Sequence, residues 1–201
     1  MNPSLVGSEM CIRDSHGTTV FSVIANEAPE TSIAIYRFPA LNMCKFENII
    51  EHINKNFIKL VNISMGSSQK SDWSCFRKAA SKYKNIIFVV SAGNNGFDID
   101  QNLIYPASFD LDNIITVTSS DQNGRLGRGS NFGKKSVDFM IPAERVEVLD
   151  HRGIKAFTGG TSYAAPRMTA MISRYLEKNP NKSVKDAVSY THLRAHETRI
   201  H

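Results

Sequence analysis

The sequence predicts an α/β fold of three layers, in which a doubly wound, mostly parallel sheet lies between helices. Apolar runs of strand length alternate along the chain with segments of helical periodicity, and the joins between them are short. One run, residues 85–93 (NIIFVVSAG), is almost continuously apolar, as expected of a strand that is covered on both faces.

The first half of the chain alternates regularly between helix and strand patterns. In residues 46–55 the apolar side chains Phe46, Ile49, Ile50 and Ile53 recur at the spacing of one helix face. The predicted elements are a helix directly after His16, a strand over 31–38, a helix over 46–55, a strand over 57–64, a helix over 71–83 capped by Ser71 or Asp72, and a strand over 85–93.

The second half continues the alternation without an internal repeat or a linker. Two more apolar runs predict strands, and a long segment after a glycine pair predicts a helix. The predicted elements are strands over 114–119 and 136–142, a helix over 162–177 and a further helix that begins within 179–188.

Composition excludes several classes of protein. The chain has 201 residues, 41% of them hydrophobic and 21% charged, which is neither the composition of a disordered chain nor that of a membrane-embedded one. The net charge of +5 is scattered. No nucleic-acid-binding motif with aromatic interleaving accompanies its densest cluster, which lies in a glycine-rich loop, so we predict neither nucleic-acid nor membrane binding. This cluster consists of Arg125, Arg128, Lys134 and Lys135.

Signals for metals and nucleotides are weak. The three cysteines, Cys11, Cys44 and Cys75, are widely spaced and show no metal-binding pattern, and they do not fix a redox compartment. Residues 97–102 (FDIDQN) fit either a calcium loop or an exposed acidic turn, and we favour the turn. Residues 128–136 (RGSNFGKKS) resemble a phosphate loop, but they lead into a strand instead of a helix.

A pair of histidines near the C-terminus, His192 and His196, has the i, i+4 spacing of a zinc pair on a helix. That spacing alone is a weak signal, so we predict no metal ligands in this chain.

The ends of the predicted strands carry the polar signals. Ser64-Met65-Gly66 and Ser91-Ala92-Gly93-Asn94 each follow a strand, and such ends share one rim of a parallel sheet. Ser162 lies between a glycine pair and a helix start, where free backbone N–H groups and the helix dipole favour an oxyanion. That setting suits a nucleophile in acyl transfer, although a serine there is more often only a helix cap.

The motifs taken together resemble the subtilase family of serine proteases over about residues 16–188. They are HGTTV at 16–20, SMG at 64–66, SAGN at 91–94 and GTSYAAP at 160–166, in the order that the family has. Two positions depart from the family pattern: Thr19 stands where a second histidine is common, and Ser22 where glycine is usual.

The resemblance implies a serine endopeptidase that acts on peptides or proteins through an acyl-enzyme. His16 would be the general base and Ser162 the nucleophile, while the Asn94 side-chain amide and the Ser162 backbone N–H would bind the oxyanion. No cofactor is required by this chemistry, and calcium stays open. The implied substrate-binding residues are Ser64, Met65 and Gly66, which would pair with the substrate as an added strand, and Ser91, Ala92 and Gly93, which would wall the primary specificity pocket.

Asp14 stands only two residues before His16. The resemblance implies that the triad aspartate precedes the histidine by roughly 30 residues and ends a different strand. We therefore predict that Asp14 is a solvated or capping carboxylate, and that the aspartate strand has no counterpart here.

The two ends of the chain, residues 1–15 and 189–201, do not resemble subtilase sequence. They look like translated sequencing-adapter read-through, so we expect foreign, disordered ends around a partial catalytic domain that is nearly inactive as given. Family resemblance implies a secreted or extracytoplasmic protein. The alternative is a non-catalytic, peptide-binding subtilase relative, although the intact set of His16, Asn94 and Ser162 favours the enzyme.

Overall fold

A computed structural model describes residues 13–37, 39 and 42–197, with side chains described for 16–37, 39 and 42–190. It contains α1 (Arg13–Glu27), α2 (Lys45–Lys55), β1 (Leu60–Ile63), the 3-10 helix η1 (Lys70–Trp73), α3 (Ser74–Lys82), β2 (Ile87–Ser91), β3 (Ile114–Ser120), β4 (Phe139–Pro142), β5 (Val146–Leu149), β6 (Lys155–Thr158), α4 (Thr161–Lys178) and α5 (Val184–Glu197).

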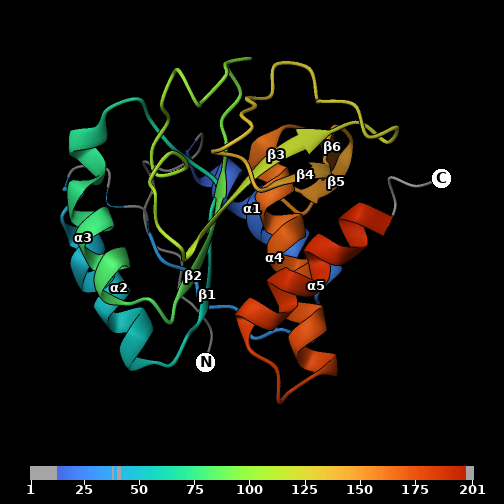
Figure 1. The fold of residues 1–201 in the computed structure, drawn as a ribbon. Coiled ribbons are helices and arrows are strands. Elements are labelled where there is room, and N and C mark those ends of the chain that lie inside the picture. Colours follow the sequence, from blue (N-terminus) through green and yellow to red (C-terminus); the bar gives the residue numbers. More distant parts are fainter. Residues whose placement is uncertain (1–12, 38, 40–41, 198–201) are drawn as a thin grey trace.

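The main sheet has the strand order β1-β2-β3-β4, and every neighbouring pair in it is parallel. Helices α2 and α3 cover one face, and α1, α4 and α5 lie on the other (Figure 1). All five residues of β2 are buried because both faces are covered. Ile87 and Val89 join the core under α4, while Phe88 and Val90 join the core under α2 and α3. This is the three-layer α/β fold that the sequence predicts.

A second, two-stranded sheet was not predicted. Strands β5 and β6 pair antiparallel, and Val146 and Val148 pack into the core on the side of α1 and α4. The backbone N–H of Leu149 also donates to the Ser22 hydroxyl in α1, at 3.0 Å. These strands have four residues each, too few for the alternation of apolar and polar residues to stand out in the sequence.

Two local predictions are wrong. Residues 31–37 form no strand: Thr31 N–H donates to Ala28 O in a turn, at 3.1 Å, and the backbone of 32–37 bonds to no described residue. The last residue of the predicted strand, Phe38, lies outside the described residues. Neither Ser71 nor Asp72 caps a helix: both lie in η1, and α3 begins at Ser74 without a side-chain cap. Helix α1 also begins before His16, at Arg13.

The described part of the chain holds no helix long and apolar enough to cross a membrane.

Candidate active site

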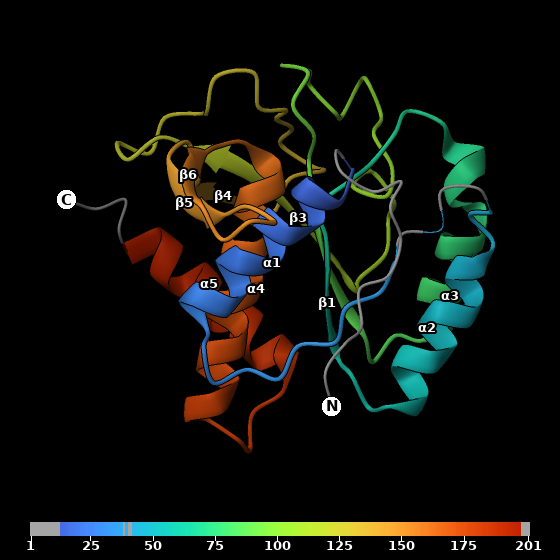
Figure 2. The same cartoon turned by 180° about the vertical axis from the view of Figure 1, so that it is seen from behind.

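Helix α1 lies beside α4 (Figure 2), and His16 in α1 faces the first turn of α4. Its ring centroid is 6.1 Å from that of Tyr163, the residue after Ser162. The Thr19 hydroxyl donates to the backbone oxygen of His16 at 2.9 Å, and it also lies 3.1 Å from the Tyr163 hydroxyl. Since the only Thr19 hydroxyl proton goes to His16, the Tyr163 hydroxyl is the donor to Thr19.

The imidazole of His16 has no described acidic partner. Burial lowers its pKa from the ordinary value of 6.5, because the protonated ring loses hydration in this half-buried position. Among the described side chains, no carboxylate makes an ion pair or hydrogen bond with it. Asp14 falls within α1, and its side chain lies outside the described residues.

Ser162 is the second residue of α4, so its backbone N–H has no acceptor within the helix. Its hydroxyl donates to the backbone oxygen of Ser64 at 3.4 Å, a long hydrogen bond. No hydrogen bond within the described residues joins Ser162 to His16. The serine therefore sits at a helix N-terminus beside the end of β1.

Asn94 is held in one orientation by Thr161. Its Oδ1 accepts the backbone N–H of Thr161 at 2.9 Å and the Thr161 hydroxyl at 3.0 Å. With the oxygen occupied by Thr161, the residue before Ser162, the Nδ2 group of Asn94 is left as the donor end of this side chain. Gly160 has φ +109°, and a Cβ there would lie 3.0 Å from Asn94 Oδ1, so both conformation and space require glycine.

Asn131 fixes the loop that carries Asn94. Its buried Oδ1 accepts the backbone N–H groups of Asn95 and Phe97, both at 2.9 Å, and its Nδ2 donates to Ala92 O at 2.8 Å. Its own N–H donates to Gly93 O at 2.9 Å. The sequence placed Asn131 in a loop resembling a phosphate site. Its contacts span 34 to 39 residues, so no local pattern marked them.

Each of the two predicted substrate-binding segments has a hydrogen bond to the start of α4, Ser64 to Ser162 and Gly93 to Thr161. Ser64 is buried and accepts a hydrogen bond from Asn62 Nδ2 at 3.0 Å, and a Cβ at Gly66 would lie 2.7 Å from Tyr105 O. Ser91 and Ala92 are buried at the end of β2, whereas Gly93 is half-buried and donates its N–H to the Thr161 hydroxyl at 3.1 Å.

The structure thus brings Ser64, Gly93, Asn94 and Ser162 together through Thr161, and it places His16 beside Tyr163. Met65 and Gly66 follow directly after Ser64. Sequence reasoning missed Thr161, although it lies inside the GTSYAAP motif, because only the fold shows that its hydroxyl meets Asn94.

The carboxylates of the acidic turn at 97–102 accept hydrogen bonds from backbone N–H groups. Burial alone would raise the pKa of Asp100, but hydrogen bonds from Ser136, Lys135 and Lys134 lower it overall. Asp98 Oδ1 accepts the N–H of Asp100 at 3.0 Å. In the described part of the chain no group of three or more His, Cys, Asp or Glu side chains could hold a metal ion.

Cys44 and Cys75 form a disulfide between the start of α2 and α3. The sequence analysis did not predict this disulfide, because three widely spaced cysteines do not show which two of them pair. Cys11 lies outside the described residues.

Comparison with known proteins finds similarity to subtilisin-like proteases. The model of the family described as "Subtilase family" matches residues 7–199. The chain is 28% identical to "Subtilisin-like protease 2" of Plasmodium falciparum over 180 residues, which cover 76% of this chain and 13% of that protein. It is 26% identical to "Subtilisin DY" of Bacillus licheniformis over 186 residues, covering 85% of this chain and 66% of the relative.

A solved structure shares the fold. The epidermin leader peptide processing serine protease of Staphylococcus aureus superposes with a TM-score of 0.72 at 24% identity, covering 86% of this chain and 56% of that chain. The chain spans less than two thirds of the length of the curated relatives named above. Since the family match over residues 7–199 covers all of the described residues, the chain belongs to the subtilase family.

Proposed function

We propose that this chain carries the nucleophile, the general base and the oxyanion donors of a serine endopeptidase. The observation that carries the proposal is the pair of hydrogen bonds from Thr161 to Asn94 Oδ1. They leave the Asn94 amide nitrogen as a donor beside the free N–H of Ser162, and two donors preset at one point suit a developing oxyanion.

In the proposed reaction the Ser162 Oγ attacks the carbonyl carbon of a peptide bond while the His16 ring accepts the hydroxyl proton. The tetrahedral oxyanion is stabilised by Asn94 Nδ2 and the Ser162 N–H. The imidazolium then gives its proton to the leaving amine, and water releases the acyl group by the same steps. Each step uses groups of the chain itself, so the proposal requires no cofactor.

The substrate we propose is a peptide or protein in an extended conformation. The backbone of residues 64–66 would pair with it on one side, and Gly93 would contact the side chain that precedes the scissile bond. The half-buried Met65 would present its side chain near that contact.

For location we propose an extracytoplasmic protein. The Cys44–Cys75 disulfide supports this, because such bonds persist in oxidising compartments.

The experiment is covalent labelling with a fluorophosphonate, followed by mass spectrometry of the labelled peptide. The proposal expects one adduct on Ser162, no adduct in Ser162→Ala, and full labelling in the control Ser68→Ala, an exposed serine nearby. A chain that binds peptides but never forms the Ser162 adduct would instead be the non-catalytic, peptide-binding relative.

A further inference from the structure

Two positions in α1 depart from the subtilase pattern, Thr19 and Ser22, and they lie about one helical turn apart, after His16. Both side chains are buried, with exposed fractions of 8% and 4%. A buried hydroxyl group is nearly always hydrogen-bonded, and each of these two bonds to a different part of the molecule. Their partners show what holds α1, the helix that carries the proposed base.

Thr19 joins the turn of the base to the first turn of α4. Its hydroxyl donates to the backbone oxygen of His16 at 2.9 Å and accepts from the Tyr163 hydroxyl at 3.1 Å. Tyr163 directly follows Ser162 and is only 9% exposed. Its ring also lies against the His16 ring, with centroids 6.1 Å apart. One side chain next to the proposed nucleophile therefore contacts both the base and the residue that bonds to the backbone of the base.

Ser22 fixes the next turn of α1 from another side. Its hydroxyl donates to Thr19 O at 2.8 Å and accepts the N–H of Leu149 in β5 at 3.0 Å. The C-terminal end of α1 is bound to α4, because Arg167 Nε donates to Glu27 Oε1 at 2.7 Å. Hydrogen bonds thus hold α1 at three places, and the bond from Thr19 to α4 lies at the end that carries the base.

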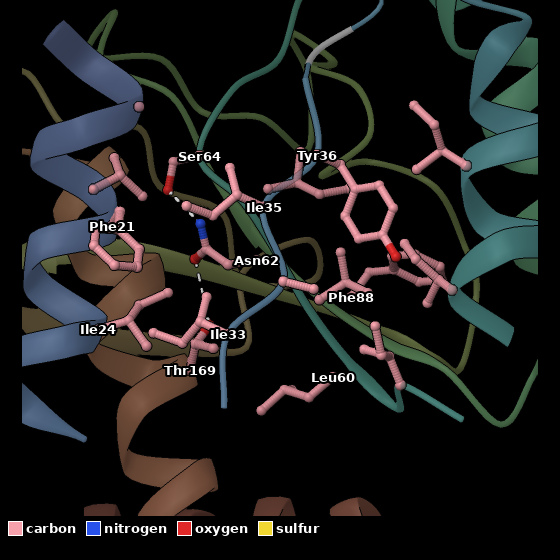
Figure 3. A pocket seen from close by; sticks show the side chains of 18 of the residues that line it. Phe21, Ile24, Ile33, Ile35, Tyr36, Leu60, Asn62, Ser64, Phe88 and Thr169 are labelled. Atoms are coloured by element: carbon pink, nitrogen blue, oxygen red, sulfur yellow. Dashed lines mark hydrogen bonds between the residues drawn. The ribbon is translucent and has the colours of Figure 1, made fainter. Parts of the chain in front are cut away.

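The opposite side of α1 faces an apolar groove, into which Phe21 and Ile24 point (Figure 3). Phe21 remains 37% exposed there. Packing of described residues is therefore incomplete on that side of the helix. The polar contacts of Thr19 and Ser22 with α4 and β5 take the larger share in fixing where α1 lies.

The bond between Thr19 and Tyr163 goes beyond what a threonine does in any helix. Threonine in a helix commonly donates to the carbonyl three or four residues before it, as Thr19 does to His16 O. The contact with Tyr163 joins residues 144 apart in the chain, so it depends on how α1 and α4 are placed. A displacement of about 1 Å in a reacting group can cost a factor of about 10² in rate.

We propose that Thr19 and Tyr163 are positioning residues, which hold the base His16 beside the nucleophile Ser162 through the hydrogen bond between their hydroxyl groups. The inference rests on the proposed peptidase reaction, because it assigns a role within that reaction. Ser22 supports the same turn of α1 from β5. The two hydroxyls act through the placement of His16 and take no part in bond making.

The test is the kinetics of fluorophosphonate labelling at Ser162, resolved into the maximal rate and the half-saturating concentration. Tyr163→Phe and Thr19→Val each remove one hydroxyl group. Each should lower the maximal rate about tenfold and change the half-saturating concentration less than about twofold, because a misplaced base slows the chemical step. The double variant should be no slower than the slower single variant, since both exchanges remove the same bond.

Two further variants separate positioning from a loss of stability. Thr19→Ser keeps the hydroxyl, so it should label within about twofold of the parent rate. Thr116→Val is the matched control, because Thr116 is 1% exposed and its hydroxyl donates to Ala107 O at 2.9 Å. Its neighbours Ile115 and Val117 face α4, so Thr116 faces the other side of the sheet. This control should lower the melting temperature as Thr19→Val does and leave the maximal rate within about twofold.

A second measurement does not depend on catalysis. Amide hydrogen exchange of residues 17–24, followed by mass spectrometry, reports how firmly this part of α1 is held. Exchange should be about fivefold faster in Tyr163→Phe and in Thr19→Val than in the parent, and unchanged in Thr116→Val.

A labelled parent whose maximal rate and hydrogen exchange are matched by Tyr163→Phe and Thr19→Val would overturn the positioning role alone. A double variant in which the two single effects multiply would also overturn it, because the hydroxyls would then act separately. A parent that never forms the Ser162 adduct would overturn the proposed function, and the positioning role with it.

Discussion

The nucleophile side and the histidine side of the candidate site differ in how their functional groups are held. Asn94 and the loop around it are fixed by Thr161 and Asn131, through hydrogen bonds of 2.8 to 3.0 Å. The His16 ring is tilted against the ring of Tyr163, with centroids 6.1 Å apart, and has no described carboxylate beside it. The proposed oxyanion donor Asn94 is thus held in one orientation, whereas the proposed base is half-buried and has no described polar partner for its ring.

This difference in support follows from where each side of the site lies relative to the main sheet. The ordered side lies where β2 and β3 are paired on both sides, so the loops that leave them start from fixed strand ends. The histidine side is carried by α1, a helix outside the sheet, and within the described residues β1 pairs with β2 alone. Among those residues a hydrogen-bond network surrounds Asn94 and not the His16 ring.

Asn94→Ala should give the largest loss on the ordered side. Removing one oxyanion donor costs a factor of about 10² to 10³ in rate, a magnitude measured in subtilisin, a member of the same family. The measurement is the rate of fluorophosphonate labelling at Ser162. The melting temperature should fall as well, because the N–H and the hydroxyl of the buried Thr161 lose their acceptor, Asn94 Oδ1. A rate unchanged within a factor of about two would show that Asn94 is no donor.

Asn131→Ala should lower the labelling rate by about tenfold and the free energy of unfolding by about 3 kcal/mol, because it leaves three backbone groups without their partner. Asn131→Asp keeps the acceptor for Asn95 and Phe97 but loses the donor to Ala92, so it should lie between Ala and the parent. Urea denaturation measures the stability. Equal effects of the two exchanges would contradict the assigned contacts.

The pH profile tests the histidine side. Since the neutral ring of His16 accepts the proton, the labelling rate should fall as the pH drops through a pKa below 6.5 and level off above it. Burial lowers the pKa of His16 in the folded chain, so the folded chain binds this proton less readily than the unfolded chain. The free energy of unfolding should therefore also fall as the pH drops below about 6.5. A midpoint above 6.5 would indicate an undescribed carboxylate that supports the ring.

The disulfide should matter for stability and not for the site. Replacing both Cys44 and Cys75 by serine should lower the free energy of unfolding by about 3 kcal/mol, since the bond closes a loop of 31 residues. The labelling rate should change less than about twofold, because α2 and α3 pack on the face away from α4. A large loss of labelling would mean that the two faces of the sheet are coupled.

Much of this fold was predictable from the sequence because burial on both faces leaves a plain signal. The apolar run at 85–93 became β2, and the periodic segment at 46–55 became α2. The prediction failed at 31–37, where the residues suit a strand but no described strand pairs with them. A β-strand requires hydrogen bonds to a neighbouring strand, and the local sequence does not show whether such a neighbour is present.

The sequence predicts the candidate site as a set of residues and not as a network. The motifs predict His16, Asn94 and Ser162 as its members. The side chain of Asn94 is oriented by Thr161, 67 residues away, and the loop around it is held by Asn131, 34 to 39 residues from the groups that it contacts. Such contacts depend on tertiary packing, so they appear only once the loops are folded.

The most direct test of this account is the peptidase turnover of the chain on a mixed peptide library, compared with its Asp14→Asn and Ser162→Ala variants. Positions two apart on a helix do not face each other, so Asp14 in α1 should not serve His16. In subtilisin, loss of the triad aspartate alone costs about 3 × 10⁴ in turnover. The account predicts a weak, Ser162-dependent turnover that Asp14→Asn leaves unchanged. Strong turnover that Asp14→Asn abolishes would contradict it.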